Sequence, residues 1–282
     1  MRKLLSLGYS SLLRRLWMIR NYRPLMDYLQ RNHGVGKLRP VMVRRWHRGA
    51  KYFRGVDADG ALLFIKVDGD CRLLQNEVDA WMHLQQTGDS AHCVGMRFFD
   101  FASEYRVAAF HWVAGEPLSS FLRKKPSAEQ LCCVMREMAS ILRELDHAGM
   151  VHRDFTPDNL LISPGLSANT VSVDLIDFAF AAIGNAAPYD RLVPLNDLSD
   201  LCHGYKIEEF LWDDTYSCLR IFDEIGRAAG VEDQVSRAEV KGRIATRTFS
   251  LNGPAARRER VGDFAPGIEK RAQLSSCPHS QI

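Results

Sequence analysis

The sequence has no run of 18 uncharged apolar residues, the minimum for a transmembrane helix, so we expect no membrane span. It has little excess of one charge: the 37 Lys and Arg against 34 Asp and Glu leave a net charge of +3, too small to indicate a nucleic-acid partner. The seven cysteines follow no metal-binding spacing, and their odd count, which includes the adjacent pair Cys132 and Cys133, favours a reducing cytoplasm.

What the chain does have is a composition that suits a folded unit with a buried core. Its 282 residues are 46% hydrophobic and 25% charged, which is enough to bury a core, and the length suits one such unit with extensions. The most informative stretch begins at His152-Arg153-Asp154, continues to Asn159 and is followed, after an apolar strand, by Asp177.

The residue types in this stretch suit phosphoryl transfer. That reaction needs a carboxylate beside the acceptor hydroxyl, and oxygen ligands that hold magnesium against the phosphates of a nucleotide. Asp154 suits the first role, and Asn159 and Asp177 suit the second. The three-residue motif occurs often by chance, so the inference depends on spacing. Asn159 follows Asp154 by 159 − 154 = 5 positions and Asp177 follows it by 177 − 154 = 23, which leaves room for strands at 159–162 and 171–176.

This pattern resembles the protein-kinase-like superfamily, in which H-R-D is followed after four residues by N, and a later strand ends in D-F-G. The resemblance implies an α+β, two-lobed protein-kinase-like fold, with a small antiparallel sheet and one helix ahead of a compact, mostly helical C-lobe. It implies ATP and Mg2+ as cofactors, Asp154 as the catalytic carboxylate, and Asn159 and Asp177 as metal ligands. His152 is implied to support the loop rather than to react. Ala179 replaces the D-F-G glycine, which removes some backbone freedom.

The upstream half contains the partners that this resemblance requires. Residues 62–67 have the pattern of a short buried strand with one lysine, Lys66, similar to the family's lysine that holds the α- and β-phosphates. Glu77 lies 77 − 66 = 11 residues later, in a segment, 72–84, with apolar residues at helical spacing. It resembles the catalytic glutamate that pairs with that lysine. Alone, both would be ordinary solvated residues, but their order ahead of Asp154 favours the pair.

Residues 107–118 run from an apolar strand into a break marked by Gly and Pro, and then into a helix start. They resemble the segment whose backbone binds the adenine ring. Phe110 is then implied to close the back of the purine pocket, and the main chain of His111 and Val113 to pair with the adenine edge. A plain core strand is the alternative, because aromatic and valine residues are common in cores.

The family's glycine-rich phosphate loop is poorly matched. Only Gly49 stands where that loop should turn, ahead of a hairpin whose turn is 57–60. Arg48 and Lys51 either supply positive charge in place of the missing glycine amides or are simply solvated. Thr156 replaces the lysine found two residues after the catalytic aspartate in typical serine/threonine kinases, so it brings a hydrogen bond but no charge.

The segment after Asp177 separates the kinase subclasses. Asp197 resembles the C-lobe aspartate that anchors the catalytic-loop backbone, it follows Asp177 by only 197 − 177 = 20 positions, and no A-P-E motif follows Asp177. This spacing is too short for a regulated activation loop with a peptide-docking platform. In size and layout the chain is most similar to small bacterial lipopolysaccharide-core sugar kinases, which act on heptose, Kdo or related sugars.

Three functional hypotheses follow. The first is an ATP- and magnesium-dependent kinase for a hydroxyl of a lipopolysaccharide-core sugar or glycolipid. The second is an atypical serine/threonine protein kinase, and the third is a nucleotide-binding pseudokinase that acts as an interaction module. The retained motif residues argue against the third, and the short segment after Asp177 favours the first over the second. The oligomeric state is not encoded in any motif.

The ends of the chain extend beyond this unit. The chain begins like a signal peptide, but Arg14 and Arg15 interrupt the apolar stretch, and no small-residue cleavage site follows. We therefore do not expect export. Trp17 and Ile19 among basic residues predict a basic amphipathic helix. That helix either lies on the anionic inner face of the cytoplasmic membrane, which would suit a glycolipid acceptor, or packs on the N-lobe. The expected segments are a basic amphipathic helix (1–34), an N-lobe with hinge (35–115), a C-lobe (116–240) that includes a helix at 127–148, and a basic tail (241–282).

Overall fold

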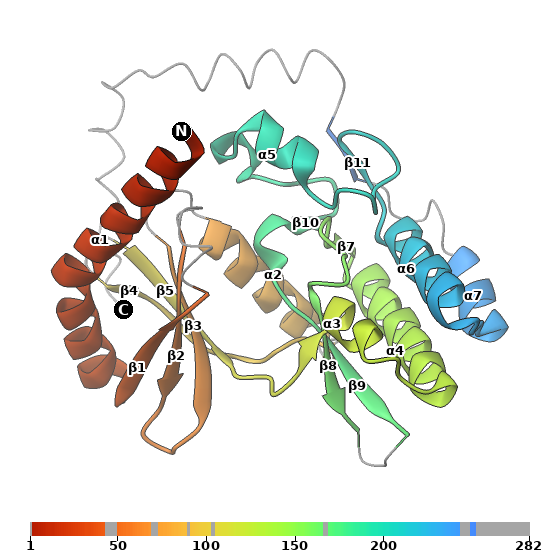
Figure 1. The fold of residues 1–282 in the computed structure, drawn as a ribbon, viewed down its shortest axis with the longest axis horizontal. Helices are drawn as coiled ribbons and strands as arrows, with labels where there is room; N and C mark the ends of the chain where they lie inside the picture. The colour runs from red at the N-terminus through yellow and green to blue at the C-terminus, as the bar shows by residue number, and fades with distance from the viewer. Residues whose placement is uncertain are drawn as a thin grey trace.

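The computed structural model shows an α+β protein (Figure 1). The predicted phosphate-loop glycine, Gly49, lies outside the described residues, as does most of the predicted basic tail. The described residues are 2–42, 50–68, 73–88, 91–102, 105–165, 169–242 and 249–251, with side chains described from Leu16 onward.

The N-terminal half is built on a sheet. Within the described residues this sheet is antiparallel and five-stranded, in the order β1-β2-β3-β5-β4. Aromatic and β-branched residues fill its strands, as suits a pleated and half-buried surface. Helix α2 packs against β3 and β5, so it closes one face. The elements of this half are α1 (Arg2–His33), β1 (Lys37–Val41), β2 (Lys51–Val56), β3 (Leu62–Asp68), α2 (Leu73–Thr87), β4 (Met96–Ala102) and β5 (Tyr105–His111).

The hairpin predicted at 57–60 joins β2 to β3. Asp57 Oδ1 accepts hydrogen bonds from the amides of Asp59 at 3.0 Å and Ala61 at 2.8 Å, which turns the chain. Gly60 has a φ of 82°, a conformation that glycine adopts without the steric cost of a side chain. The register that this turn sets places Lys66 opposite Tyr52 on β2.

Helix α1 lies along the sheet (Figure 1), and its second half packs there. Leu25 and Leu29 are fully buried, and the Trp17 ring lies 6.2 Å from the Phe53 ring. For Trp17 and the residues after it, the structure therefore favours packing on the sheet over the membrane-surface alternative. Ile19 still points outward, with 80% of its surface exposed.

The C-terminal half is mostly helical, with α4, α6 and α7 grouped together (Figure 1). Strand β8 pairs with β6 and β9, and β7 pairs with β10. The elements of this half are β6 (Glu116–Pro117), α3 (Leu118–Arg123), α4 (Ala128–His147), β7 (Met150–Val151), β8 (Leu160–Pro164), β9 (Val171–Leu175), η2 (Phe178–Phe180), β10 (Ala182–Ile183), η3 (Asp190–Leu192), α5 (Leu195–Asp200), β11 (Leu211–Trp212), α6 (Asp214–Ala229), α7 (Gln234–Lys241) and β12 (Phe249–Ser250).

The helix predicted at 127–148 is confirmed as α4. Ser127 caps it: the Ser127 hydroxyl accepts from the Gln130 amide at 3.2 Å, and the Gln130 side chain accepts from the Ser127 amide at 3.0 Å. Its apolar face is buried and packs against β9 and α6. The helix ends just ahead of β7, so it leads the chain into the motif that starts at His152.

None of the described helices is both long enough and apolar enough to cross a membrane. The described cysteines are all free thiols: Cys93, Cys132, Cys133, Cys202 and Cys218.

Candidate active site

A cavity of about 370 Å3 lies between the sheet and the strands β8 and β9. Tyr52 and Phe64, stacked with ring centroids 5.8 Å apart, line it from the sheet side. Leu161 and Leu175 line it from the C-terminal half. A slot with aromatic and aliphatic walls suits a flat, apolar ring system. The cavity is lined at its polar end by Lys66, Glu77, Asp158, Asn159 and Asp177.

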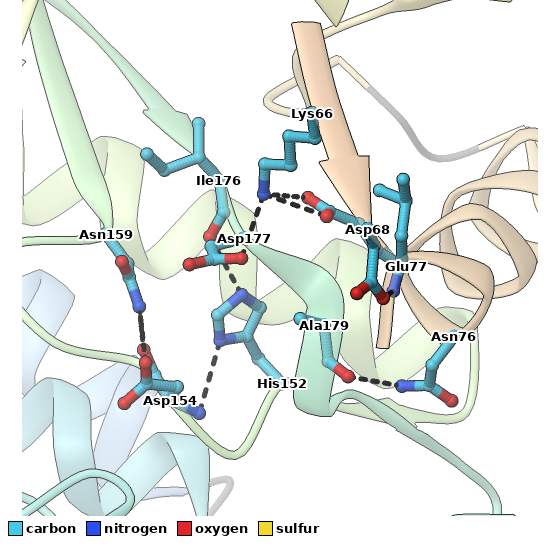
Figure 2. Close-up of polar contacts among 11 residues, drawn as sticks. Lys66, Asp68, Asn76, Glu77, His152, Asp154, Asn159, Ile176, Asp177 and Ala179 are labelled. Atoms are coloured by element: carbon cyan, nitrogen blue, oxygen red, sulfur yellow. Dashed lines mark hydrogen bonds and ion pairs between the residues drawn. The ribbon is translucent and has the colours of Figure 1, made fainter. Parts of the chain in front are cut away.

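Lys66 stands between two carboxylates (Figure 2). Its Nζ donates to both Glu77 oxygens, at 2.7 and 2.8 Å, and to Asp177 Oδ1 at 2.9 Å. The predicted pair of Lys66 and Glu77 is therefore present, and Asp177 joins it. Burial lowers the pKa of Lys66, but the carboxylates of Asp177 and Glu77 raise it by more, so the ammonium stays charged.

Two neighbouring side chains fix the position of α2, which carries Glu77. Asn76 donates to the backbone carbonyls of Ala179 at 2.9 Å and Ala181 at 3.0 Å, which ties α2 to the segment after Asp177. At the start of the helix, the Asp68 carboxylate accepts from the Leu74 amide at 3.3 Å. The helix and the segment that carries Asp177 thus form one unit around Lys66.

Asp177 has the left-handed conformation, with a φ of 69°. Phe178–Phe180 follow as a turn of 3-10 helix, and the Phe178 ring packs edge-on against His152 at 4.7 Å. The unusual backbone angle therefore falls on the aspartate, whose short polar side chain tolerates it better than most. Ala179 lies in the 3-10 turn and does not have a positive φ, so alanine is accommodated where the family pattern has glycine.

Asn159 is placed to hold Asp154. Its Nδ2 donates to the Asp154 carbonyl and to Asp154 Oδ2, both at 2.8 Å (Figure 2). The amide nitrogen is thereby used, and the Asn159 side-chain oxygen is the atom left to face the cavity. Together with the Asp177 carboxylate it makes a set of hard oxygen donors, which fits magnesium better than a softer metal.

His152 supports this loop, as predicted. One ring nitrogen, Nε2, donates to the Ile176 carbonyl at 3.1 Å, and the other accepts from the Asp154 amide at 3.3 Å. Burial lowers the pKa of His152 to about 4, so the ring is neutral at pH 7. A neutral ring with both nitrogens engaged suits a structural role.

The prediction that Asp197 anchors the loop backbone is wrong. Asp197 is exposed on α5, whereas the buried Asp214 at the start of α6 accepts from the amides of His152 at 2.5 Å and Arg153 at 3.1 Å. The sequence-based choice failed because the anchor lies beyond a segment of short turns that has no periodic pattern. The segment from Asp177 to its anchor is therefore 214 − 177 = 37 positions long, which removes the length argument for a sugar acceptor.

Arg153 makes a second buried link that the sequence did not indicate. Its guanidinium donates to the Asp190 carboxylate in a two-pronged contact, at 2.7 and 2.6 Å, and both side chains are almost fully buried. It also donates to the Phe180 carbonyl at 2.5 Å and lies over the ring of Trp212. The segment after Asp177 is thus tied to the loop that carries Asp154 by a buried ion pair.

The residues predicted to meet a purine all line the cavity: Phe110, His111 and Val113. The His111 amide already donates to the Gly95 carbonyl at 2.8 Å, so a main-chain contact of His111 with a ligand has to come from its carbonyl. Trp81 and Trp112 also line the cavity, and neither was predicted to do so. Helical spacing from Glu77 to Trp81 was the available signal for the first.

Lys51 does not add charge to the cavity. Its Nζ lies 5.4 Å over the Trp17 ring, on the side of the sheet covered by α1, because successive strand residues point to opposite faces. Arg48, the other residue considered for that role, lies outside the described residues, as does Gly49.

No protein-family model matches the chain, and no curated protein matches it. The chemistry of the site therefore has to be inferred from its own side chains.

Proposed function

We propose that the chain is an ATP- and magnesium-dependent phosphotransferase with a protein-kinase-like fold, acting on a hydroxyl group. The observation that carries this proposal is the position of Lys66, held at 2.9 Å or less by Glu77 and Asp177 at the polar end of an apolar slot. Burying an ammonium with its carboxylate partners costs desolvation energy that the ion pairs do not reliably repay, so a function explains this cluster better than stability does. An anionic ligand with a flat ring, such as ATP, uses both the slot and the charge.

Each polar residue then has a distinct task. Bound ATP and magnesium supply the phosphoryl group and neutralise its charge. Lys66 contacts the phosphates, and Glu77 keeps it in place. Asp177 and the Asn159 side-chain oxygen hold the metal. Asp154 orients the acceptor hydroxyl and accepts its proton, a role that needs an ionised carboxylate within hydrogen-bonding reach.

The acceptor in this proposal is a sugar hydroxyl of a lipopolysaccharide-type core, in a cytoplasmic enzyme. With the anchor at Asp214 rather than Asp197, this choice rests on the resemblance alone. A protein acceptor is the second candidate, and the observation that favours it is the 37-position segment between Asp177 and Asp214, which is long enough to contact a peptide.

The first experiment separates an enzyme from a pseudokinase. Titration calorimetry with ATP and magnesium should detect binding to the wild-type chain. Lys66→Met should weaken that binding by roughly tenfold to a hundredfold, since a charge-assisted contact contributes about 1.5–3 kcal/mol. Asp154→Asn should leave it unchanged but abolish transfer of labelled phosphate. Binding without any transfer by the wild-type chain would favour the pseudokinase.

The second experiment addresses the acceptor. Purified protein with magnesium and γ-labelled ATP should label lipopolysaccharide core far better than casein, and Asp154→Asn serves as the matched blank. Preferential labelling of casein would instead favour the protein-kinase alternative. If the protein bound ATP but labelled neither acceptor, only the nucleotide-binding part of the proposal would remain supported.

A further inference from the structure

We propose that the backbone amide of Cys202 positions the Asp154 carboxylate for proton transfer. This inference rests on the proposed function and deepens it. The Cys202 amide donates to Asp154 Oδ1 at 3.2 Å, across 48 residues of sequence. Asn159 donates to the other oxygen, Oδ2, at 2.8 Å. Each carboxylate oxygen thus has its own donor from a different part of the fold.

Two donors on different oxygens restrict what a carboxylate can do. An aspartate held through one oxygen still rotates about its last side-chain bond, which moves the other oxygen. Contacts from Asn159 and Cys202, one on each oxygen, fix that rotation. Fixed orientation of a reacting group is a large part of catalytic power.

The backbone at Cys202 is unusual in a way that fits this role. Its φ of 56° lies in the left-handed region, which residues other than glycine rarely adopt. Such conformations persist only where the surroundings enforce them, and they gather at functional sites. Here the strained residue is the one whose amide reaches Asp154.

The turn around Cys202 is clamped from outside. The Tyr205 amide donates to the Cys202 carbonyl at 3.0 Å, and the Ser217 hydroxyl on α6 donates to the Tyr205 carbonyl at 2.6 Å. The Cys202 thiol lies 3.7 Å from both the Phe155 carbonyl and the Ser217 hydroxyl. These contacts therefore connect the turn to helix α6 and to the loop that carries Asp154.

An ester in place of the Leu201–Cys202 peptide bond tests the amide directly, because it removes the N–H and keeps the side chain. The acceptor is the one that the wild-type chain labels. We expect kcat to fall roughly tenfold or more, as for loss of a hydrogen bond to a charged group. The KM for ATP should stay within about twofold, since Cys202 lies outside the cavity lining. An unchanged kcat would overturn the proposal.

Two matched variants separate positioning from simple turn integrity. An ester at Tyr205 and the substitution Cys202→Gly each loosen the clamp but keep the N–H that reaches Asp154. Each should therefore lower kcat by clearly less than the ester at Cys202. A loss in either variant equal to that of the ester at Cys202 would contradict a specific role for the amide.

If the chain with the ester at Cys202 does not fold, Ser217→Ala decides, because it loosens the clamp and leaves the amide chemically intact. It should lower kcat without raising the KM for ATP, and an unchanged kcat would overturn the proposal. Failure of the proposed function looks different: the wild-type chain itself would then transfer no phosphate from ATP to lipopolysaccharide core or casein.

Discussion

The two sides of the cavity hold their functional side chains in different ways. On the sheet side, Lys66 is held by charge, between the carboxylates of Glu77 and Asp177. On the other side, Asp154 is held by the backbone: Asp214 binds two amides of its loop, and the Cys202 amide binds its side chain. Charge pairing depends on ionisation, whereas backbone anchoring depends on the whole fold. Substitution of the partly exposed Asp177 should therefore change activity more than stability, whereas breaking the buried contacts of the loop side should change stability as well.

Asp177→Asn should have the largest effect, and on activity alone. Asparagine keeps the size of the side chain and loses the charge that faces Lys66 and that the proposed magnesium site requires. We expect phosphoryl transfer to fall by about 10³-fold or more, roughly 4 kcal/mol in the transition state. The melting temperature should barely change, because 40% of the Asp177 side chain is exposed. Turnover close to wild type at saturating magnesium would contradict the metal role.

Asp190→Asn tests the loop side, where the first effect should be on stability. The substitution leaves the Arg153 guanidinium buried without its countercharge. Breaking a buried pair in this way costs about 3–5 kcal/mol. Asp197→Asn is the matched control: it removes an exposed carboxylate from the same segment and should change the free energy of unfolding by about 0.5 kcal/mol or less. Equal effects in urea denaturation would show that the pair is dispensable.

The difference between the sides also explains what the sequence could predict. Lys66 and Glu77 were predicted because the chain resembles the kinase family in their order ahead of Asp154, with the two residues 11 positions apart on elements that hydrophobic periodicity marks. The anchors of the loop lie 37 residues away at Asp190, 48 at Cys202 and 62 at Asp214, in turns without a repeating pattern. Contacts of that separation depend on tertiary packing, which a single sequence does not encode locally.

The sheet side also relies on α1, and Trp17→Ala measures how much. Trp17 packs against the rings of Phe53 and Tyr105, each with centroids 6.2 Å away. Because Trp17 is only partly buried, we expect a loss of about 2 kcal/mol in unfolding free energy, less than for a fully buried tryptophan. Ile19→Ser, at an exposed position two residues on, should cost about 0.5 kcal/mol or less.

The same two variants test whether α1 also binds a membrane surface. If α1 serves only the sheet, neither variant changes binding to vesicles that contain anionic lipid once folding is matched. A selective loss of vesicle binding in Ile19→Ser would show that the outward face of α1 also meets lipid.

The smallest predicted effect lies where the two sides are joined. His92, in the connection between α2 and β4, contacts Glu144 and, at 3.0 Å, Glu137, both on α4, while its carbonyl accepts from the Leu175 amide at 2.8 Å. The Glu144 hydrogen bond is the main cause that raises the pKa of His92. A raised pKa in the folded state means that the contribution is fully present below the unfolded pKa, about 6.5, and is lost as the pH rises through the folded value. His92→Gln should therefore cost about 1 kcal/mol near pH 5.5 and less near pH 9, as measured by urea denaturation. A cost that grew with pH would mean that neutral His92, not the charged ring, makes the stabilising contact.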